Sequence, residues 1–426
     1  MLDRTAAPAF ETIQNVNFQR AEKFVLNNGI PVFTLNAGSQ ELCRIDLIFK
    51  AGTLYQSKPL LAVAVSDLLE SGTSKYSAKE FSEEIDFFGS FIEPSAGTDY
   101  ASVSLFSLNK FLKESLPFLE NMVKDPTFPQ TELETWVSIK KQKFLTQQKK
   151  VSTEAKKKFA NLLFGNNHPY GKMTELAHFD GLSRKDLISF FKTHYNSTQC
   201  TIIAAGCLPD FLLESLNQLF GSEPWGHNSN ISAPKTEPFS LKERIHFSEK
   251  PQAVQSAIRI GRRLFNKTHP DYFKFQVLNT VLGGYFGSRL MANIREDKGY
   301  TYGIGTGLHS YTQDGYFFIS TEVGAEVTSK ALHEIYFEMD RLQREPIPEN
   351  ELTTVKNYLL GQFLRSADGP FSQADLFRSM WEFDLDYDYF NNFIRSVQET
   401  TSLELQQLAK KYLSKENMVE LVVGKK

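Results

Sequence analysis

Histidine side chains are the first place to look for metal-dependent chemistry in this chain. Zinc hydrolases hold their metal with histidines three or four residues apart on one helix, beside a carboxylate that activates water. The stretch "HEIYF" (333–337) begins in this way, but Phe337 stands where the second histidine would be needed. None of the eight histidines has a partner at that spacing. They stand at positions 168, 178, 194, 227, 246, 269, 309 and 333.

Two other catalytic motifs are also missing. No G-x-S-x-G stretch occurs, which argues against a serine hydrolase with the usual nucleophile turn. The stretch "GNNHPYGK" (165–172) imitates a phosphate-binding loop, but five residues instead of four separate its glycines. Met173 then stands where a serine or threonine would hold magnesium. An independent active site of a familiar kind is therefore not expected.

One short helix carries polar residues in an unexpected place. The stretch "LLAVAVSDLLESGTSKYS" (60–77) predicts a buried helix that stops at Gly72. Val63 and Asp67 are four residues apart and therefore share a face, and Ser66 lies beside them. A serine and an aspartate in so apolar a helix call for a functional or a structural reason.

Strands and helices alternate around this helix. An Asn-Gly turn predicts a hairpin over residues 25–36, and alternating apolar residues predict a strand over 100–108. Ser77 is a predicted N-cap for a helix over 77–89. A long helical zone follows over 109–165. This order is typical of a mixed α and β domain.

The chain divides into two halves that resemble each other. Pro, Gly, Asn and Ser gather without hydrophobic periodicity near a linker that we place at 221–242, between domains at 1–220 and 243–426. The stretch "DPTFPQTELETW" matches "REPIPENELTTV", with Pro129 and Pro348 offset by 219 residues. A duplicated domain explains this match most simply. The alternative is that two unrelated domains share a Pro-x-x-Glu-Leu helix start, since capping chemistry recurs independently.

Composition excludes several classes of function. The chain has 426 residues, 47 basic against 50 acidic, and a pI near 6.3, so no general attraction to nucleic acid or anionic membrane is expected. No run of 18 apolar residues predicts a membrane span, and the first ten residues lack the pattern of a signal peptide. Cys43, Cys200 and Cys207 form no C-x-x-C motif, which favours a reducing, cytoplasmic location. A signal peptide removed from a periplasmic protein would leave the same sequence.

Several segments together resemble a known family. The stretches "FKAGTLYQSKP…DLLESGTSKYSAKEF", "NNHPYGK" and "GGYFGSRLMANIREDKGYTYGIGTG" are similar to the insulinase and pitrilysin metallopeptidases. The similarity is greatest to their short bacterial members, which are like mitochondrial processing peptidase. Active members carry an inverted zinc motif, H-x-x-E-H, on the helix before the Gly-Thr turn. Counted back from Gly72, those positions hold Val63, Ser66 and Asp67 here.

The resemblance implies that this chain has lost its zinc site. The family's third ligand is a glutamate on a later helix, where Phe144 stands, and a second family glutamate corresponds to Gln147. A catalytic zinc needs three protein ligands, which Asp67 alone cannot supply. We therefore expect no metal in this chain, and we interpret Asp67 as a polar residue that lines a chamber or caps a helix.

The same resemblance implies that a second part of the machinery is intact. Arg295 and Tyr302, seven residues apart, match a pair that contacts substrate at the zinc centre in the family. Both side chains can donate hydrogen bonds to a scissile carbonyl. The alternative is that Arg295 pairs with a neighbouring acid and Tyr302 is an ordinary strand aromatic. Gly283 and Gly284 resemble the family's glycine-rich, substrate-binding segment, though glycine there could simply allow close packing.

Lysines gather on the helical zone that carries Phe144. Between residues 140 and 158 eight lysines accompany one acid, Glu154. A solvated helix face is the simpler interpretation. Lysines that faced a chamber would instead favour acidic peptide segments.

These observations predict an α+β protein of two homologous domains, each a mainly antiparallel sheet with helices packed on one face. By resemblance it is the catalytically incomplete subunit of a heteromeric zinc metalloendopeptidase. A homologous partner would hold the zinc, and this chain would close the chamber, bind peptide and supply Arg295 and Tyr302. The alternative is a purely structural or peptide-binding core-type subunit with no role in proteolysis.

Overall fold

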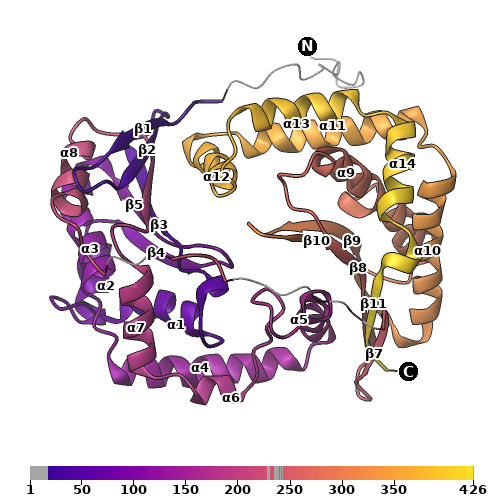
Figure 1. The fold of residues 1–426 in the computed structure, drawn as a ribbon, viewed down its shortest axis with the longest axis horizontal. Coiled ribbons are helices and arrows are strands. Elements are labelled where there is room, and N and C mark those ends of the chain that lie inside the picture. The colour runs from indigo at the N-terminus through magenta and orange to yellow at the C-terminus, as the bar shows by residue number, and fades with distance from the viewer. Residues whose placement is uncertain (1–17, 228–230, 235–238, 240, 242, 426) are drawn as a thin grey trace, which may run out of the picture.

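Two β-sheets face each other across the molecule, each backed by its own helices (Figure 1). The computed structural model describes residues 18–227, 231–234, 239, 241 and 243–425. The predicted linker at 221–242 therefore lies partly outside the described residues. The first ten residues, which bear on the signal-peptide prediction, lie wholly outside them.

The first sheet and its helices form the N-terminal half. Its strands run in the order β1-β2-β6-β3-β5-β4. The strand bounds are β1 Glu22–Val25, β2 Pro31–Asn36, β3 Leu42–Phe49, β4 Phe91–Ala96, β5 Ala101–Leu108 and β6 Cys200–Gly206. The helix bounds are α1 Leu61–Asp67, α2 Ala78–Phe87, α3 Leu112–Lys124, α4 Gln130–Gln148, α5 Val151–Phe164, α6 Ala177–Asp180, α7 Arg184–His194 and α8 Leu212–Leu216.

The second sheet forms the C-terminal half, with strand order β7-β11-β8-β10-β9. The strand bounds are β7 Ile245–Glu249, β8 Gln255–Leu264, β9 Ile304–Ser310, β10 Gly315–Gly324 and β11 Val419–Gly424. The helix bounds are α9 Tyr272–Asn279, α10 Thr328–Arg344, α11 Glu349–Ser366, α12 Pro370–Trp381, α13 Asp388–Glu399 and α14 Ser402–Tyr412. Two π-helical turns, Thr280–Gly284 and Met291–Asp297, lie between α9 and β9.

The strand pairing confirms the duplication. In the N-terminal sheet β2 pairs parallel to β6, and the pairs β6–β3, β3–β5 and β5–β4 are antiparallel. In the C-terminal sheet β7 pairs parallel to β11, and the pairs β11–β8, β8–β10 and β10–β9 are antiparallel. Five strands of each sheet therefore share one topology, with β1 as an addition to the first, and a chance similarity of two helix starts does not account for it.

Local signals in the sequence set the predicted elements. Ser77 caps α2 and exchanges hydrogen bonds with Glu80 in a capping box. Pro129 and Pro348 precede α4 and α11 with nearly identical backbone angles, so the matched stretches begin equivalent helices. The hairpin predicted at the Asn-Gly turn forms between β1 and β2, with Gly29 at φ +93°.

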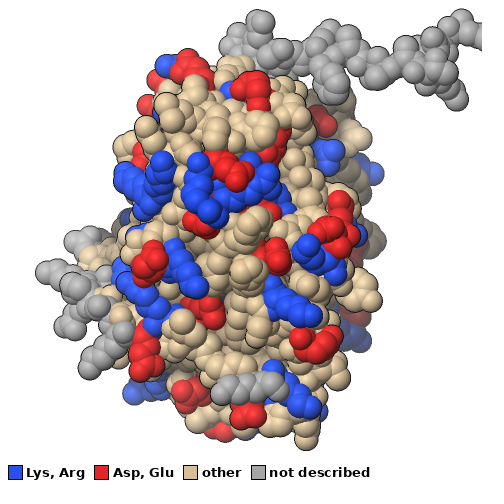
Figure 2. All heavy atoms as spheres, turned by 90° about the vertical axis from the view of Figure 1, so that its right-hand side faces the viewer, with Lys and Arg blue, Asp and Glu red and all other residues tan. Residues whose placement is uncertain are grey.

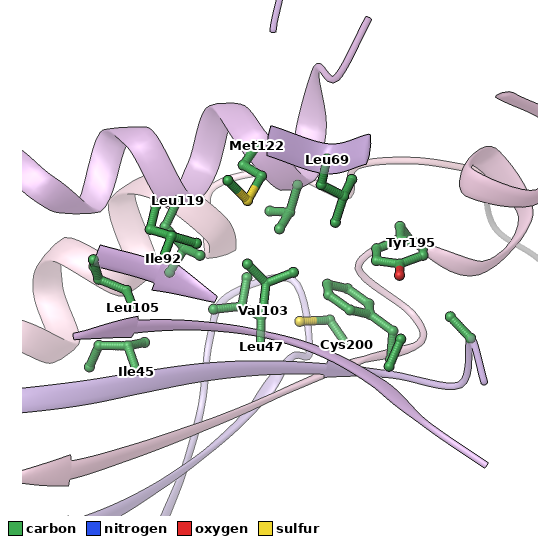
Figure 3. Packing of buried hydrophobic residues seen from close by; sticks show 14 of the residues in the cluster. Ile45, Leu47, Leu69, Ile92, Val103, Leu105, Leu119, Met122, Tyr195 and Cys200 are labelled. Atoms are coloured by element: carbon green, nitrogen blue, oxygen red, sulfur yellow. The ribbon is translucent and has the colours of Figure 1, made fainter. Parts of the chain in front are cut away.

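The N-terminal core lies between the sheet and its helices. In Figure 3, Leu47 of β3 and Val103 of β5 point toward Leu119 and Met122 of α3. All four side chains are fully buried. Residues that alternate with these on the strands point to the opposite face of the sheet, which leaves that inner face free for another element.

Each inner face is packed by a helix of the opposite half. Helix α5 lies on β8 and β11, where Ala155 and Phe159 join a cluster with Ala257 and Leu421. Helix α12 lies on β2 and β6, where Phe377 joins a cluster with residues of both strands. This exchange adds to the predicted arrangement, since each sheet has its own helices on one face and one borrowed helix on the other.

Polar contacts also join the halves. Asp99, in the β4–β5 turn, accepts hydrogen bonds from the Tyr170 hydroxyl at 2.8 Å and from the Thr312 amide at 3.0 Å. Arg44 of β3 donates to Asp375 of α12 at 2.6 Å. The two halves therefore contact one another through apolar and charged groups together.

The outer face of the C-terminal half carries basic and acidic side chains side by side (Figure 2). This mixture agrees with the near balance of charge over the whole sequence. Among the residues that the structure describes, no helix is both long and apolar enough to cross a bilayer.

Candidate functional site

Helix α1 is positioned as the sequence predicts. It is buried on one side among the N-terminal core residues, continues as a 3-10 turn at Leu68–Ser71, and stops at Gly72. Gly72 has φ +126°, a conformation that other residues rarely adopt. The turn after it therefore fixes where the polar residues of α1 are presented.

Asp67 is held by two residues of α4. The Trp136 indole donates a hydrogen bond to Asp67 Oδ2 at 2.8 Å, and the Lys140 ammonium lies 2.6 Å from the same oxygen. The Lys140 ammonium also lies 5.6 Å from the centre of the Trp136 ring, within range of a cation–π contact. About a third of each side chain of the ion pair is exposed. A protein ammonium therefore provides the positive charge next to this carboxylate.

Ser66 does not share this environment. It is 1% exposed and lies in the core against Tyr195, although neither hydroxyl has a partner of ordinary hydrogen-bond geometry among the described residues. Burial raises the pKa of Tyr195, and the nearby Ser66 hydroxyl opposes part of that rise. Val63 is half-buried and packs against the same core. Of the three motif positions, Asp67 therefore offers the one charged group.

Glu70 lies near the Asp67 carboxylate and near a second one, that of Glu93. Burial raises the pKa of Glu70, and the charges of Asp67 and of Glu93 on β4 raise it further. Proximity of like charges favours protonation. Lys140 is the cation that balances this local negative charge in an ion pair with Asp67.

Phe144 packs against another aromatic ring, one turn beyond Lys140 on α4. It is buried, and its ring lies 5.3 Å from that of Phe179 of α6. The Lys157 ammonium lies 4.2 Å from the Phe144 ring centre. Gln147 is half-buried. Neither position places a carboxylate beside Asp67.

These residues do not fit a zinc ion. Zinc requires nitrogen, thiolate or carboxylate donors from three or four side chains, whereas the motif positions hold an isopropyl group, a core hydroxyl and a carboxylate already paired with an ammonium. Over residues 18–425, wherever the structure describes them, no cluster of three His, Cys, Asp or Glu side chains has metal-binding geometry. The expectation that this chain holds no zinc remains a prediction about binding.

The second candidate group lies in the C-terminal half. Arg295 is in the π-helical turn Met291–Asp297, and its guanidinium lies 4.5 Å from the ring centre of Phe286. Its contact with Glu296 is long, at 4.0 Å. Tyr302 is 95% exposed and has no hydrogen-bond partner among the described residues. The two side chains thus reach solvent, and no described contact joins them to Asp67.

Two family models cover most of the chain. The model described as insulinase (peptidase family M16) matches residues 32–168, and the model described as peptidase M16 inactive domain matches residues 181–359. The chain belongs to the peptidase M16 family. The first match includes the Val63–Asp67 positions, and the second includes Arg295 and Tyr302.

Individual M16 proteins are similar to this chain over most of its length. The uncharacterized zinc protease YmxG of Bacillus subtilis is 23% identical over 354 residues, which cover 82% of this chain and 84% of that protein. The mitochondrial-processing peptidase subunit beta of Rattus norvegicus is 23% identical over 371 residues, which cover 83% and 74%.

Solved structures show the same M16 fold. The structure described as a peptidase M16 inactive domain from Pseudomonas fluorescens has a TM-score of 0.86 at 23% identity and covers 95% of this chain and 98% of that one. A protease from Helicobacter pylori has a TM-score of 0.86 at 16% identity, with 96% and 100% covered. At these identities the likeness establishes the fold.

The glycine-rich M16 segment packs tightly in this chain. Gly283 is buried, and a β-carbon there would lie 2.5 Å from the Thr306 methyl group of β9. Gly284 has more room, since a β-carbon would lie 3.1 Å from the Thr280 hydroxyl. Packing alone is therefore enough to require glycine at 283, and a substrate-binding role for both glycines stays a prediction.

Sequence reasoning missed the residues that hold the candidate groups. Trp136 and Lys140 are four apart on α4 and contact Asp67 together, and Phe286 stacks on Arg295. The i, i+4 spacing of Trp136 and Lys140 was available as a signal that both lie on one helix face. Their partner on α1 could not be read from spacing, because tertiary packing brings the two helices together.

Proposed function

We propose that this M16 chain is the catalytically incomplete subunit of a heteromeric zinc metalloendopeptidase. Its homologous partner would carry an intact H-x-x-E-H motif and the zinc, and this chain would close the chamber and bind peptide. The observation that supports this most directly is the Asp67–Lys140 ion pair, since an ammonium already neutralises the one charged group at the motif positions.

Arg295 and Tyr302 are the residues that this chain would supply to the reaction. A guanidinium and a phenol can both donate hydrogen bonds to a carbonyl oxygen that gains negative charge, which stabilises the transition state. Arg295 is free for this role because its carboxylate contact is long, and Tyr302 because its hydroxyl has no partner among the described residues. In this proposal both meet a peptide held at the partner's zinc.

The relatives support pairing in an indirect way. The mitochondrial-processing peptidase beta protein is by name a subunit, and this chain covers 74% of its rat form. A heterodimer of two M16 chains would place one intact and one degenerate motif in the same complex. We also propose a cytoplasmic location, which the three unpaired cysteines support because they form no disulfide.

The test is to compare the purified chain with and without an M16 homologue from the same genome that retains H-x-x-E-H. Cleavage of a quenched fluorescent peptide is measured with added zinc. The proposal predicts no chelator-sensitive cleavage by this chain alone and higher turnover when both chains are present. If the partner's turnover does not change, this chain is instead a structural or peptide-binding subunit without a role in proteolysis.

A further inference from the structure

The inner face of the C-terminal sheet carries an unusual set of exposed side chains beside α5. On β10, Phe317 and Ile319 are buried in the core, while Phe318 and Ser320 alternate with them and are half-exposed on the inner face. Arg259 of β8 lies opposite Ser320 in the register. This part of the inner face is therefore only partly covered by α5.

Arg259 lacks an acidic partner on this face. Its guanidinium lies 5.3 Å from the ring centre of Phe318, and none of the described residues offers it a carboxylate within ion-pair distance or a hydrogen bond. Burial lowers the pKa of Arg259. By contrast, Arg263 on the same strand and face pairs with Asp314. A partly desolvated guanidinium without a counter-ion is poised to bind an anion.

A second cation reaches the same region from α5. Val151, Ala155 and Phe159 point from α5 into the cluster on the sheet, so Lys156 lies on the flank of the helix and is exposed. Burial lowers the pKa of His309 on β9, the Lys156 charge lowers it further, and the Asp99 charge opposes this change. Lys156 forms no ion pair with any described acid.

The lysines on the opposite flank of α5 are paired with an acid. Glu154 pairs with Lys158 at 2.6 Å and with Lys250 at 2.7 Å. Unpaired positive charge on α5 near the sheet is therefore concentrated on the Lys156 flank. Helix α5 therefore has one flank where Lys158 is in an ion pair and one flank where Lys156 is not.

Gly307 leaves space for the Phe318 ring on the inner face of the sheet. Gly307 of β9 lies opposite Phe318, and a β-carbon there would lie 2.7 Å from the Phe318 ring. The Phe318 ring therefore lies over Gly307, and its centre is 5.3 Å from the Arg259 guanidinium. A larger residue at 307 would displace the ring that supports the guanidinium.

Two acids lie near this region without pairing with either cation. Asp99 accepts hydrogen bonds from the neutral Tyr170 hydroxyl and Thr312 amide and keeps its charge. Glu322 lies two residues beyond Ser320 on β10, on the same face, and makes no ion pair with Arg259. Arg259 and Lys156 therefore have no ion-pair partner among the described residues, and the Phe318 ring lies beside Arg259.

We propose that Arg259, Lys156 and Phe318 form a subsite that binds carboxylate side chains of an extended peptide. This inference deepens the proposed function, on which it rests, by naming acidic peptide segments as the preferred ligands. The guanidinium fork can donate two parallel hydrogen bonds to one carboxylate, and the lysine supplies a second positive charge from α5.

The test is fluorescence anisotropy on the purified full chain with three labelled peptides of equal length. One has a central glutamate cluster, the second has glutamines there, and the third has lysines. All three end in an amide, so that side chains alone supply the carboxylates. We expect the glutamate peptide to bind about tenfold more tightly than the glutamine peptide at low salt, with the advantage shrinking as salt rises.

Arg259→Gln should remove most of this advantage. Its matched control is Arg262→Gln, which removes the same charge from the opposite face of the same strand and should leave the advantage intact. Lys156→Gln, at an exposed helix position, should weaken the advantage even if the Arg259 variant does not fold. Equal affinities for the three peptides, or equal losses in the Arg259 and Arg262 variants, would overturn the proposal.

This experiment needs no partner subunit. If the chain prefers acidic peptide but does not raise the turnover of its partner, the subsite is supported and the proposed function is contradicted. If the chain raises turnover but does not prefer acidic peptide, the proposed function is supported and the subsite is contradicted.

Discussion

The Lys140 ammonium and the Asp67 carboxylate, 2.6 Å apart, join α4 to α1 at the position that the sequence resemblance assigns to a zinc motif. The Trp136 indole holds the same carboxylate oxygen. The positive charge that a metal would bring to this carboxylate is thus supplied by the protein. The contact therefore joins α1 and α4 through an ion pair and a hydrogen bond.

Replacing Lys140 should weaken this helix contact. Lys140→Met keeps the aliphatic stem and removes the charge, so Asp67 retains one hydrogen bond and loses its counter-ion. Because the pair is partly exposed, we expect a loss of about 1 kcal/mol in the free energy of unfolding, measured by urea denaturation. Lys143→Met, at an exposed position on the same helix, should change it by less than about 0.5 kcal/mol. Equal effects of the two changes would show that the ion pair contributes nothing.

The ion pairs of Glu154, one of which joins the two halves, should lose their stabilising effect at low pH. Burial by itself would raise its pKa, but hydrogen bonds from Lys158, Lys250 and Ser248 outweigh burial and lower the pKa to about 2. Because the folded-state pKa lies below the unfolded value, the stabilisation is complete above the unfolded pKa and is lost as pH falls toward the folded one.

The pH dependence of unfolding measures this effect. Glu154→Gln should lower stability by about 1 to 2 kcal/mol at pH 7 and by much less near pH 2.5, after discounting for solvent screening. Glu349→Gln, at the exposed start of α11, is a control for a general change of charge. A Glu154→Gln deficit that stays constant between pH 7 and pH 2.5 would contradict the assignment.

Two glycines should respond to alanine in opposite directions. Gly283→Ala places a methyl group 2.5 Å from Thr306 and should destabilise the protein by about 1 to 3 kcal/mol. Gly361→Ala, inside α11 with nothing within 4 Å of the new β-carbon, should stabilise it by up to about 1 kcal/mol. Thermal unfolding of both variants measures the signs. A neutral Gly283→Ala would remove the packing explanation and favour a binding role for that glycine.

Arg295 should matter for turnover by the complex. Arg295→Ala should lower turnover of the two-chain complex by about 10²-fold, the scale expected for loss of one hydrogen-bond donor to a transition state. Arg395→Ala, an exposed arginine of α13, should leave turnover unchanged. The measurement is the steady-state rate with a quenched peptide, after confirming that both variants still bind the partner. An unchanged rate for Arg295→Ala would favour the purely structural alternative.

Much of the fold could be predicted because short-range chemistry determines it. Ser77 caps its own helix, and Pro129 and Pro348 begin equivalent helices through local backbone geometry. The repeated pattern along the chain therefore predicted the duplication. The exchange of α5 and α12 between the halves was not predicted, because it depends on the inner faces of two sheets that form far from these helices in the sequence.

The candidate site was predicted in a similar, uneven way. The loss of a histidine ligand at Val63 and of the glutamate base at Ser66 is visible from residue type alone, and the structure adds that Ser66 is buried in the core. The Asp67–Lys140 contact and the Phe286–Arg295 stack required the structure, since each joins residues through tertiary packing. The uneven charge of α5 also required it, since sequence shows lysines and not their partners.

The central claim is that this chain contributes to a zinc peptidase without holding the zinc. The most direct measurement is the zinc content and peptidase rate of the purified chain alone, and then of the same chain mixed with an M16 homologue that retains H-x-x-E-H. We predict no bound zinc and no cleavage for the chain alone, and zinc-dependent cleavage that exceeds the partner's own rate for the mixture. Stoichiometric zinc with chelator-sensitive cleavage by this chain alone would contradict the account.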